Sequence, residues 1–249
     1  MNVPLRLEID GRLATITLDD PERRNLLGTD MFDALEDALE RTGDSRLIRI
    51  RAQGKAFCSG FDLAACVEDP GALGVFTSRL GEIVRRLRHA RQVVVGEVQG
   101  AALAGGCALA SACDIVLAST TASFGYPVHR IGVSPAVAMP ALLATTTHGA
   151  ARALALSGNT INAEEAHNCG LVHHVYAPDQ LSEASDRLCA QLLTHPEGVL
   201  AETKRSFEEL NDPTEDGLIN EGISRTINTA ESEEARRMLL AFWSGKASS

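Results

Sequence analysis

The amino-acid sequence predicts an α/β fold that ends in a helical region. Short strand-like segments rich in valine, isoleucine and leucine alternate with helical or glycine-rich segments up to about residue 158. From residue 163 onwards the hydrophobic pattern is helical almost throughout. The sequence has no repeat of fixed period and no low-complexity linker. We therefore predict an α/β core over residues 1–195 and a helical C-terminal subdomain over residues 196–249, divided near His195-Pro196.

The individual elements follow from hydrophobic periodicity and from the residues that begin or end them. Apolar and polar residues alternate on either side of Gly11-Arg12, which predicts a β-hairpin over 5–18. Thr29 or Asp30 is placed to cap a helix over 31–41. The other predicted strands are 47–51, 93–98 and 115–118, and the other predicted helices are 163–169, 181–193, 198–209, 217–227 and 233–243.

Charge and cysteine usage disfavour several classes of protein. The 249 residues include 33 acidic and 23 basic side chains, which gives a formal net charge of -10. Nucleic-acid binders depend on basic surfaces, so we expect no nucleic-acid partner, and we expect backbone amides or a few placed cations to hold any anionic ligand. None of the six cysteines forms a C-x-x-C pair or clusters with histidine, so we expect no metal site, no disulfide framework and a reducing compartment.

The N-terminal residues alternate between apolar and polar and lack the apolar core of a signal peptide. No uncharged segment is long enough to span a membrane. These observations predict a soluble, cytoplasmic protein without a membrane partner.

A glycine-rich segment over 100–110 is the first candidate for a functional site. Gly105 begins a run of small, uncharged residues through Ala112, and a helix that is apolar on every side is a buried helix. The first amides of a helix have no partner within it and lie at its positive end, so they suit an oxygen that gains negative charge during a reaction. The alternative is that these glycines only allow close packing of the helix.

Four short motifs together resemble a known family. Residues 54–63 read G-K-A-F-C-S-G-F-D-L, and residues 100–114 read G-A-A-L-A-G-G-C-A-L-A-S-A-C-D. The turn P-E-R-R-N precedes them at 21–25, and an A-x-x-x-G-L-V pattern follows them at 166–172. In this order, the motifs resemble those of the crotonase superfamily, the enoyl-CoA hydratase/isomerase-like proteins. The resemblance covers nearly the whole chain.

The resemblance implies a fold, a ligand and an assembly. It implies a crotonase-like spiral of ββα units, closed by C-terminal helices that pack in trimers or dimers of trimers, and therefore a homotrimer or homohexamer. The implied partner is an acyl-CoA substrate, with coenzyme A as part of the substrate and no separate cofactor. By position, the amides of Phe61 and Gly105 are implied to form an oxyanion hole for the thioester carbonyl. One such donor contributes roughly 3 kcal/mol of transition-state stabilisation.

Residues in and before the first motif are implied to bind the coenzyme. The resemblance places the adenine against the backbone around Ser59, Asp62 and Leu63. It also implies that Arg23 or Arg24 contacts the coenzyme phosphates, and the alternative for both arginines is a solvated charged turn.

Two positions depart from the superfamily's pattern. Its hydratases carry one glutamate in G-G-x-E-L and a second in F-G-x-P-E, and here Ala108 and Val128 occupy these positions. General acid–base catalysis needs a titratable group within hydrogen-bond reach of the proton that it moves. Neither alanine nor valine supplies one, so we predict that ordinary hydration of an enoyl-CoA is slow or absent.

Three residues are candidates to replace the missing glutamates. His129 titrates near neutrality, but an extended chain would turn it away from the ligand, and the alternative is a solvent-facing or structural histidine. Tyr126 can donate a hydrogen bond, with packing as the alternative. Glu97 interrupts an apolar strand and could act as a buried acid, and the alternative is a pair with an arginine at a subunit contact. We interpret three further residues as structural: Cys58, Cys107 and Asp114.

The leading hypothesis for function is an enzyme of the enoyl-CoA hydratase/isomerase family that binds an acyl-CoA and stabilises an enolate or oxyanion. Because both glutamates are missing, isomerisation, decarboxylation and thioester hydrolysis are as plausible as hydration. The second hypothesis is a catalytically silent acyl-CoA-binding protein. Both hypotheses keep the coenzyme site, so binding alone does not separate them.

Overall fold

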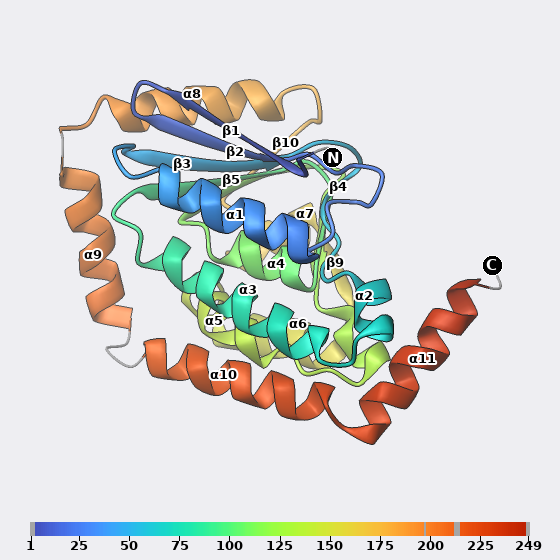
Figure 1. Cartoon of the computed structure of the whole chain (residues 1–249). Coiled ribbons are helices and arrows are strands. Elements are labelled where there is room, and N and C mark those ends of the chain that lie inside the picture. Colours follow the sequence, from blue (N-terminus) through green and yellow to red (C-terminus); the bar gives the residue numbers. More distant parts are fainter. Residues whose placement is uncertain (1–2, 197, 212–214, 248–249) are drawn as a thin grey trace.

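The computed structural model describes residues 3–196, 198–211 and 215–247, which form two sheets surrounded by helices (Figure 1). The larger sheet contains six strands in the order β1 (Leu5–Asp10), β2 (Leu13–Leu18), β3 (Leu47–Ala52), β5 (Val93–Val98), β7 (Ile115–Ser119) and β10 (His174–Tyr176). The smaller sheet contains four strands in the order β4 (Ala56–Cys58), β6 (Ala101–Leu103), β8 (Ser123–Gly125) and β9 (Thr160–Asn162). The pairs β1–β2 and β8–β9 are antiparallel, and the other neighbours are parallel.

The chain repeats one structural unit as it passes between the two sheets. β3, β5 and β7 lie in the larger sheet, and each is followed by a strand of the smaller sheet, namely β4, β6 or β8. Helices then return the chain: α2 (Leu63–Glu68) and α3 (Ala72–Arg88) after β4, α4 (Gly105–Ser111) after β6, and the 3-10 helices η1 (Pro127–Ile131) and η2 (Ala136–Ala138) with α5 (Met139–Thr145) after β8. This arrangement confirms the α/β fold built from a spiral of ββα units.

Helices cover both faces of the larger sheet. α1 (Thr29–Arg41), α3 and α4 lie on one side, and α8 (Leu181–Leu193) covers the other (Figure 1). α6 (His148–Ser157) and α7 (Ala163–Asn168) lie between α5 and β10 in the chain. No helix in the described part of the chain is long and apolar enough to cross a membrane.

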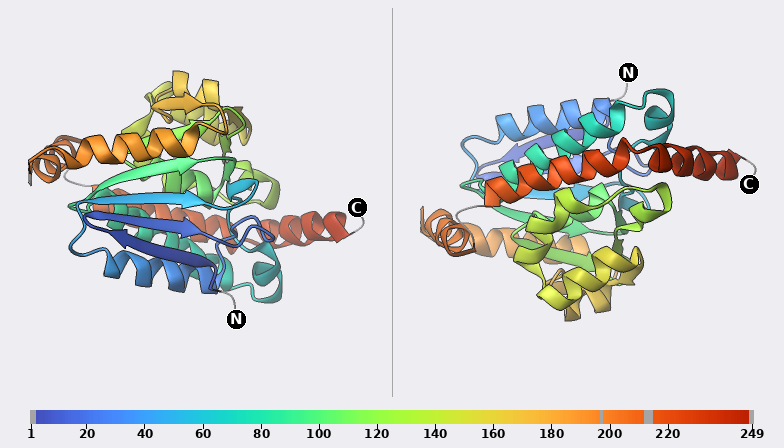
Figure 2. Two further views of the ribbon diagram at one scale, coloured as in Figure 1. Left: turned by 90° about the horizontal axis from the view of Figure 1, so that it is seen from above. Right: turned by 90° about the horizontal axis from the view of Figure 1, so that it is seen from below.

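Three C-terminal helices complete the structure: α9 (Val199–Asn211), α10 (Glu215–Ala230) and α11 (Glu233–Ala247). α10 packs against α3, α5 and η2, and α11 packs against η1 and α2. Figure 2 shows α10 and α11 following one another across one side of the molecule. The division of the chain near residue 195 stays a prediction.

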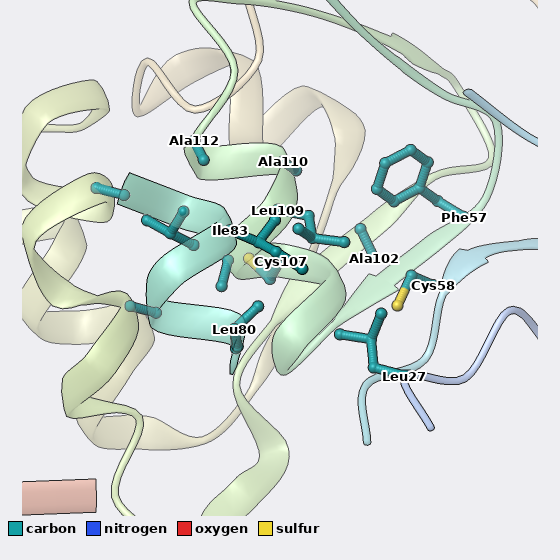
Figure 3. Packing of buried hydrophobic residues seen from close by; sticks show 14 of the residues in the cluster. Leu27, Phe57, Cys58, Leu80, Ile83, Ala102, Cys107, Leu109, Ala110 and Ala112 are labelled. Atoms are coloured by element: carbon teal, nitrogen blue, oxygen red, sulfur yellow. The ribbon is translucent and has the colours of Figure 1, made fainter. Parts of the chain in front are cut away.

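Side chains alternate between the two faces of the larger sheet, and this alternation creates two hydrophobic clusters. The main cluster includes Ile48 and Val94 and fills the space between the sheet and α1, α3 and α4. Figure 3 shows its centre, where Ile83 of α3 and Leu109 of α4 belong to the same packed set. The second cluster lies under α8 and contains Leu47, Val93, Val95, Leu117, Leu181, Ala184, Cys189 and Leu192.

Most of the predicted elements are confirmed, with small shifts at their ends. The expected cap of α1 is wrong, because the N-cap residue is Gly28 and no side chain caps this helix. The strands of the smaller sheet and β10 were not predicted, since three residues are too few to show a periodic pattern. β10 also interrupts the region after residue 163 that was expected to be helical.

A buried ion pair holds α9 against the core. The Nζ atom of Lys204 lies 2.8 Å from Oδ2 of Asp114, and it donates to the carbonyl oxygens of Leu87 at 2.8 Å and Gln92 at 3.0 Å. Asp114 also accepts a hydrogen bond from the amide of Val94 at 2.7 Å. A buried charge is tolerated only where partners compensate its lost hydration. These contacts agree with the interpretation of Asp114 as a structural residue.

We predict that Lys204→Ala lowers the free energy of unfolding by about 3–5 kcal/mol, because it leaves the Asp114 carboxylate without its cation in a desolvated place. Urea denaturation measures this change. The neighbouring exposed Arg205, which pairs with Glu202 at 2.6 Å, is the matched control, and Arg205→Ala should change stability by less than about 1 kcal/mol. Equal effects of the two substitutions would contradict this interpretation of Lys204.

His173 makes stability depend on pH. Its Nδ1 atom accepts a hydrogen bond from the amide of Val116 at 2.9 Å, which requires this nitrogen to be unprotonated. Burial lowers the pKa of His173 below 6.5. The unfolded chain therefore takes up the proton first, so stability is full above about pH 6.5 and falls as the pH drops towards the folded pKa. His173→Asn keeps an acceptor but cannot be protonated, and we expect urea denaturation to show a smaller loss of stability below pH 6.5.

Candidate active site

Two chain segments that are distant in sequence meet at the N-terminus of α4. A Cβ atom at Gly106 would lie 2.1 Å from the carbonyl oxygen of Cys58, and one at Gly60 would lie 2.9 Å from the Cβ atom of Ala104. Gly60 also has a φ of +93°, which side chains rarely allow. The glycines therefore do permit close packing, as the alternative interpretation holds. This packing brings the backbone of residues 58–61 against the start of α4.

The same contact places two backbone amides on one cavity. The amide of Leu27 donates to the carbonyl of Gly60 at 2.8 Å and the amide of Asp62 donates to the carbonyl of Leu27 at 3.2 Å, so the Phe61 amide points to the other side of the chain. Gly105 is the first residue of α4, and its amide has no partner within the helix. Among the described residues, no oxygen accepts a hydrogen bond from either the Phe61 or the Gly105 amide.

Ala104, directly before α4, has the backbone angles φ 50° and ψ -115°. A residue with a side chain adopts a positive φ at a cost of about 1–3 kcal/mol, and only where its surroundings impose it. Here the amide of Ala104 donates to the carbonyl of Gly125 at 2.8 Å, and its carbonyl accepts from the amide of Ala108 at 3.0 Å. These two bonds fix the turn from β6 into α4 and hence the direction of the Gly105 amide.

Asn25 holds the turn over residues 20–25 that borders the cavity. Its side chain is fully buried, donates to the carbonyls of Gln53 at 3.0 Å and Ala56 at 2.9 Å, and accepts from the amide of Asp20 at 2.8 Å. Its φ is 53°, a conformation that asparagine adopts more readily than most residues. Sequence reasoning missed this positioning role, and the available signal was an asparagine at the end of a turn that begins with proline.

A cavity of about 840 Å³ lies beside the two amides, within the usual range for a small-molecule site. Its exposed lining residues, which mark its mouth, are Glu22, Arg23 and Arg24 beside the start of α2, Arg130 of η1 and Trp243 of α11. Its other walls come from α3, α4, η1, the segment after η1 and α10. Eight of the predicted site residues line it: Arg23, Arg24, Ser59, Phe61, Asp62, Leu63, Gly105 and Tyr126. His129 and Glu97 are not among its lining residues.

Comparison with known proteins identifies the family. A sequence model described as Enoyl-CoA hydratase/isomerase matches residues 8–243. The chain belongs to the enoyl-CoA hydratase/isomerase family. It is 32% identical over 218 residues to the 1,2-epoxyphenylacetyl-CoA isomerase of Escherichia coli. This alignment covers 84% of the present chain and 83% of the isomerase. It is 29% identical over 245 residues to the crotonyl-CoA hydratase of Syntrophomonas wolfei. This alignment covers 95% of the present chain and 88% of the hydratase.

Solved structures of the enoyl-CoA hydratase/isomerase family share the fold. The crystal structure of an enoyl-CoA hydratase/isomerase from Pseudoalteromonas atlantica T6c superposes with a TM-score of 0.86 at 25% sequence identity, and the match covers 97% of each chain. The present chain is therefore an enzyme of this family with the crotonase fold. The two relatives above are named for different reactions, so membership of the family does not fix the reaction.

At the mouth of the cavity, the polar side chains hold one another in place. Asp62 caps α2 by accepting from two of its first amides, and Arg23 pairs with Asp20 at 2.8 Å and with Asp62 at 3.8 Å. The hydroxyl of Ser59 donates to the carbonyl of Arg24 at 3.2 Å. No carboxylate in the described residues pairs with the guanidinium of Arg24, so its charge is directed to solvent or to a ligand.

The inner wall of this family member's cavity carries Ala108 of α4 and Val128 of η1, at the positions of the missing glutamates. Among the described residues that line the cavity, the only acidic ones are Glu22 and Asp62. Both belong to the segments that form its mouth. The inner wall therefore supplies no carboxylate that could move a proton at the acyl group.

His129 lies on the 3-10 helix η1. The extended backbone conformation that we considered for this residue is therefore wrong. A 3-10 helix has three residues per turn, and side chains three positions apart share an edge. Val128 and Ile131 share one edge and Pro127 and Arg130 share the next, and both edges line the cavity. His129 is exposed, and its Nδ1 atom would lie 2.9 Å from a Cβ atom at Gly158. This placement favours the alternative of a solvent-facing or structural histidine, because His129 faces Gly158 and is not among the residues that line the cavity.

Tyr126 is buried and lines the cavity, but its hydroxyl is engaged with α4. The hydroxyl lies 3.4 Å from Oγ of Ser111, and Ser111 uses its own hydrogen to donate to the carbonyl of Cys107 at 2.8 Å. Tyr126 is therefore the donor to Ser111. Burial raises the pKa of Tyr126 well above its ordinary value, so the phenol is neutral at about pH 7 and is not a base. These contacts favour the packing alternative.

Glu97 lies outside the cavity. It shares the face of β5 that carries Val93 and Val95, and this face packs under α8. Its Oε2 atom lies 3.9 Å from Nη1 of Arg49, which also pairs with Asp186 of α8. These contacts favour the alternative for Glu97, a pair with an arginine, which here lies within this one chain.

The buried thiols of Cys58 and Cys107 lie behind the two amides and are protonated. Burial raises the pKa of each to about 12. A thiol with such a pKa is a poor nucleophile and a poor metal ligand at neutral pH. No group of three or more histidine, cysteine or acidic side chains that could hold a metal ion gathers in the described part of the chain.

We predict that Gly60→Ala weakens binding of an acyl-CoA, because the new Cβ atom would push Ala104 and the Gly105 amide away from Phe61. The positive φ adds strain, so the free energy of unfolding should fall by about 1–3 kcal/mol. Isothermal titration calorimetry and urea denaturation measure the two effects. Gly149→Ala on α6 is the matched control, since a Cβ there meets nothing within 4 Å, and it should leave binding unchanged. Unchanged binding by Gly60→Ala would contradict the assigned role of this contact.

Proposed function

We propose that this enzyme binds an acyl-CoA thioester in the cavity and stabilises its enolate by hydrogen bonds from the Phe61 and Gly105 amides to the thioester oxygen. The observation that supports this proposal is that Phe61 and Gly105, whose amides have no acceptor among the described residues, line the same cavity. Fixed donors that face a developing negative charge need not reorient during the reaction, and each contributes about 10²–10³ in rate. Coenzyme A takes part as the carrier portion of the substrate.

We expect the coenzyme to lie across the mouth of the cavity. The backbone around Ser59, Asp62 and Leu63 lies there and offers peptide groups to the adenine. Arg24 is the better candidate for the phosphates, because Arg23 is held in ion pairs. Arg23 then has a supporting role, since it fixes the carboxylate that caps α2.

The residues at the inner wall argue against hydration as the main reaction. Addition of water to an enoyl thioester needs a group that orients the water and a group that transfers protons. Each positioned acid or base contributes about 10²–10⁴ in rate. Ala108 and Val128 supply neither, and Tyr126 is already a donor to Ser111.

Decarboxylation is the reaction that these residues support best. In a malonyl-type thioester, the bond between the α-carbon and the carboxylate breaks, its electron pair moves to the thioester carbonyl, and carbon dioxide leaves. The enolate that forms is held by the two amides and then takes a proton from water. Isomerisation would require a base to remove a proton from carbon, and hydrolysis would require an activated water. Decarboxylation requires only the oxyanion hole to form the enolate.

A catalytically silent acyl-CoA-binding protein is the second candidate. It is favoured by the same observation that disfavours hydration, namely an inner wall without a carboxylate among the described residues. Such a protein would bind the thioester with the same amides and release it unchanged.

We also propose that the chain assembles as a homotrimer or homohexamer. The family resemblance supports this proposal, and large apolar side chains of the helices are exposed in the single chain and available for such contacts: Val75, Leu156, Val199, Phe207, Leu218 and Leu240. Light scattering coupled to size-exclusion chromatography measures the assembly, and a monomer at micromolar concentration would contradict it.

We predict that a panel of thioesters separates these functions. Malonyl-type thioesters should lose carbon dioxide, and crotonyl-CoA should be hydrated at least about 100-fold more slowly than by a family member with both glutamates. Headspace carbon dioxide and absorbance of the enoyl thioester measure the two reactions. Rapid hydration of crotonyl-CoA would show that the argument from Ala108 and Val128 is wrong.

Controls distinguish the remaining outcomes of the panel. His129→Ala should leave every rate unchanged, because the side chain faces Gly158. Binding without turnover of any thioester would establish the silent binder. Absence of heat with both coenzyme A and its thioesters would exclude the coenzyme site itself.

A further inference from the structure

The side chain of Leu27 lies against the first residue of α4. Its Cδ1 atom would lie 2.7 Å from a Cβ atom at Gly105, and the next nearest atoms, on Leu80 and Phe61, would lie at 3.5 Å. Leu27 is fully buried and is not among the residues that line the cavity. Figure 3 shows it in the packed centre of the main cluster, with Cys58 and Leu80. Its side chain therefore supports Gly105 without facing a ligand.

The backbone of the same residue holds the other amide. The amide of Leu27 donates to the carbonyl of Gly60 at 2.8 Å, and the carbonyl of Leu27 accepts from the amide of Asp62 at 3.2 Å. These two bonds flank Phe61 and form a parallel bridge between Leu27 and Phe61. One residue therefore contacts Phe61 through its main chain and Gly105 through its side chain.

The ring of Phe61 fills the rest of this space. Its centroid lies 5.9 Å from that of Phe76 and 6.2 Å from that of Phe32, so the ring is held between α3 and α1. Its Cε1 atom would lie 3.5 Å from a Cβ atom at Gly105, at ordinary van der Waals distance. A densely packed interior transmits a change of volume to its neighbours. The separation of the Phe61 and Gly105 amides therefore depends on the side chains packed here.

We propose that Leu27 is a positioning residue that sets the separation of the Phe61 and Gly105 amides. This inference rests on the proposed function, because it concerns the two donors of the proposed oxyanion hole. A smaller side chain at position 27 would leave a space into which the first turn of α4 can move. Misplacement by about 1 Å can cost about 100-fold in rate. Leu27 therefore acts on the reaction through the two amides, without touching the substrate.

A pair of ligands that differ only at the carbonyl measures the contact with the amides. Propionyl-CoA carries the thioester oxygen, and the thioether S-propyl-CoA has a methylene group in place of the carbonyl. Isothermal titration calorimetry gives the two dissociation constants, and their ratio reports the hydrogen bonds to the oxygen. We expect the unmodified enzyme to bind the thioester about tenfold or more tightly than the thioether, because two hydrogen bonds are lost with the oxygen.

Variants of Leu27 then test its role. Leu27→Ala should reduce this ratio at least about threefold and leave the affinities for S-propyl-CoA and free coenzyme A unchanged. Leu27→Val removes less volume and should show the same change to a smaller degree, so it serves if Leu27→Ala does not fold. Leu27→Met nearly conserves the volume and should keep the ratio.

Leu87→Ala is the matched control. Leu87 of α3 is an equally buried leucine of the main cluster and does not line the cavity. Its truncation should lower stability against urea to a degree similar to Leu27→Ala, and it should leave the ratio unchanged. A loss of stability alone therefore does not account for a change in the ratio.

A combined variant tests the contact between Leu27 and Gly105 directly. Gly105→Ala introduces a methyl group that Cδ1 of Leu27 obstructs more closely than any other atom, so it should lower the ratio. Leu27→Ala removes this obstruction. The double variant should therefore have a higher ratio than Gly105→Ala alone, a non-additive effect expected of residues in contact. A double variant no better than Gly105→Ala would argue against the contact.

The remaining outcomes separate this proposal from the proposed function. An unchanged ratio in both Leu27→Ala and Leu27→Val, or an equal decrease in Leu87→Ala, would reject Leu27 as a positioning residue and leave the proposed function intact. Equal weakening of the thioester, the thioether and free coenzyme A by Leu27→Ala would also reject it, since Leu27 would then support the whole cavity. A ratio of about one in the unmodified enzyme would reject the proposed oxyanion hole itself.

Discussion

The packing of residues 58–61 against the first turn of α4 is the constraint on which the site depends. At Gly106 the carbonyl of Cys58 leaves no room for a side chain, and at Gly60 both φ and the methyl group of Ala104 exclude one. The parallel pairing of β4 with β6 brings these segments together at corresponding points of successive ββα units. The fold itself therefore brings Phe61 and Gly105, whose amides have no acceptor among the described residues, to one cavity, as the proposed oxyanion hole requires.

In the proposed mechanism, an oxyanion hole made from main-chain amides separates charge stabilisation from proton transfer. The first function depends on glycine positions and on the strained turn at Ala104. The second depends on side chains at the inner wall, where this chain has Ala108 and Val128. One function can therefore be kept while the other changes. This separation explains how family members named for an isomerase and a hydratase share one fold.

Much of the fold was predictable because its signals are local, and the failures had identifiable physical causes. Helices such as α8 show a 3.6-residue period over enough residues to be recognised, whereas three-residue strands such as β10 do not. The face on which the Glu97 side chain lies could have been inferred from the sequence. Every second residue of a strand lies on the same face, so Glu97 shares the face of Val93 and Val95, which pack under α8. Asn25 acts through contacts with Gln53 and Ala56, which are distant in sequence.

The sequence by itself determined the two glycine motifs, the absence of both glutamates and the mouth residues, because each of these is a property of residue identity at a fixed spacing. Only the tertiary structure decided where the side chains after Tyr126 point. A 3-10 helix turns His129 towards Gly158 and brings Val128 and Arg130 to the cavity. That conformation is set by packing against α11, a helix about a hundred residues further along the chain. No local pattern encodes such a contact.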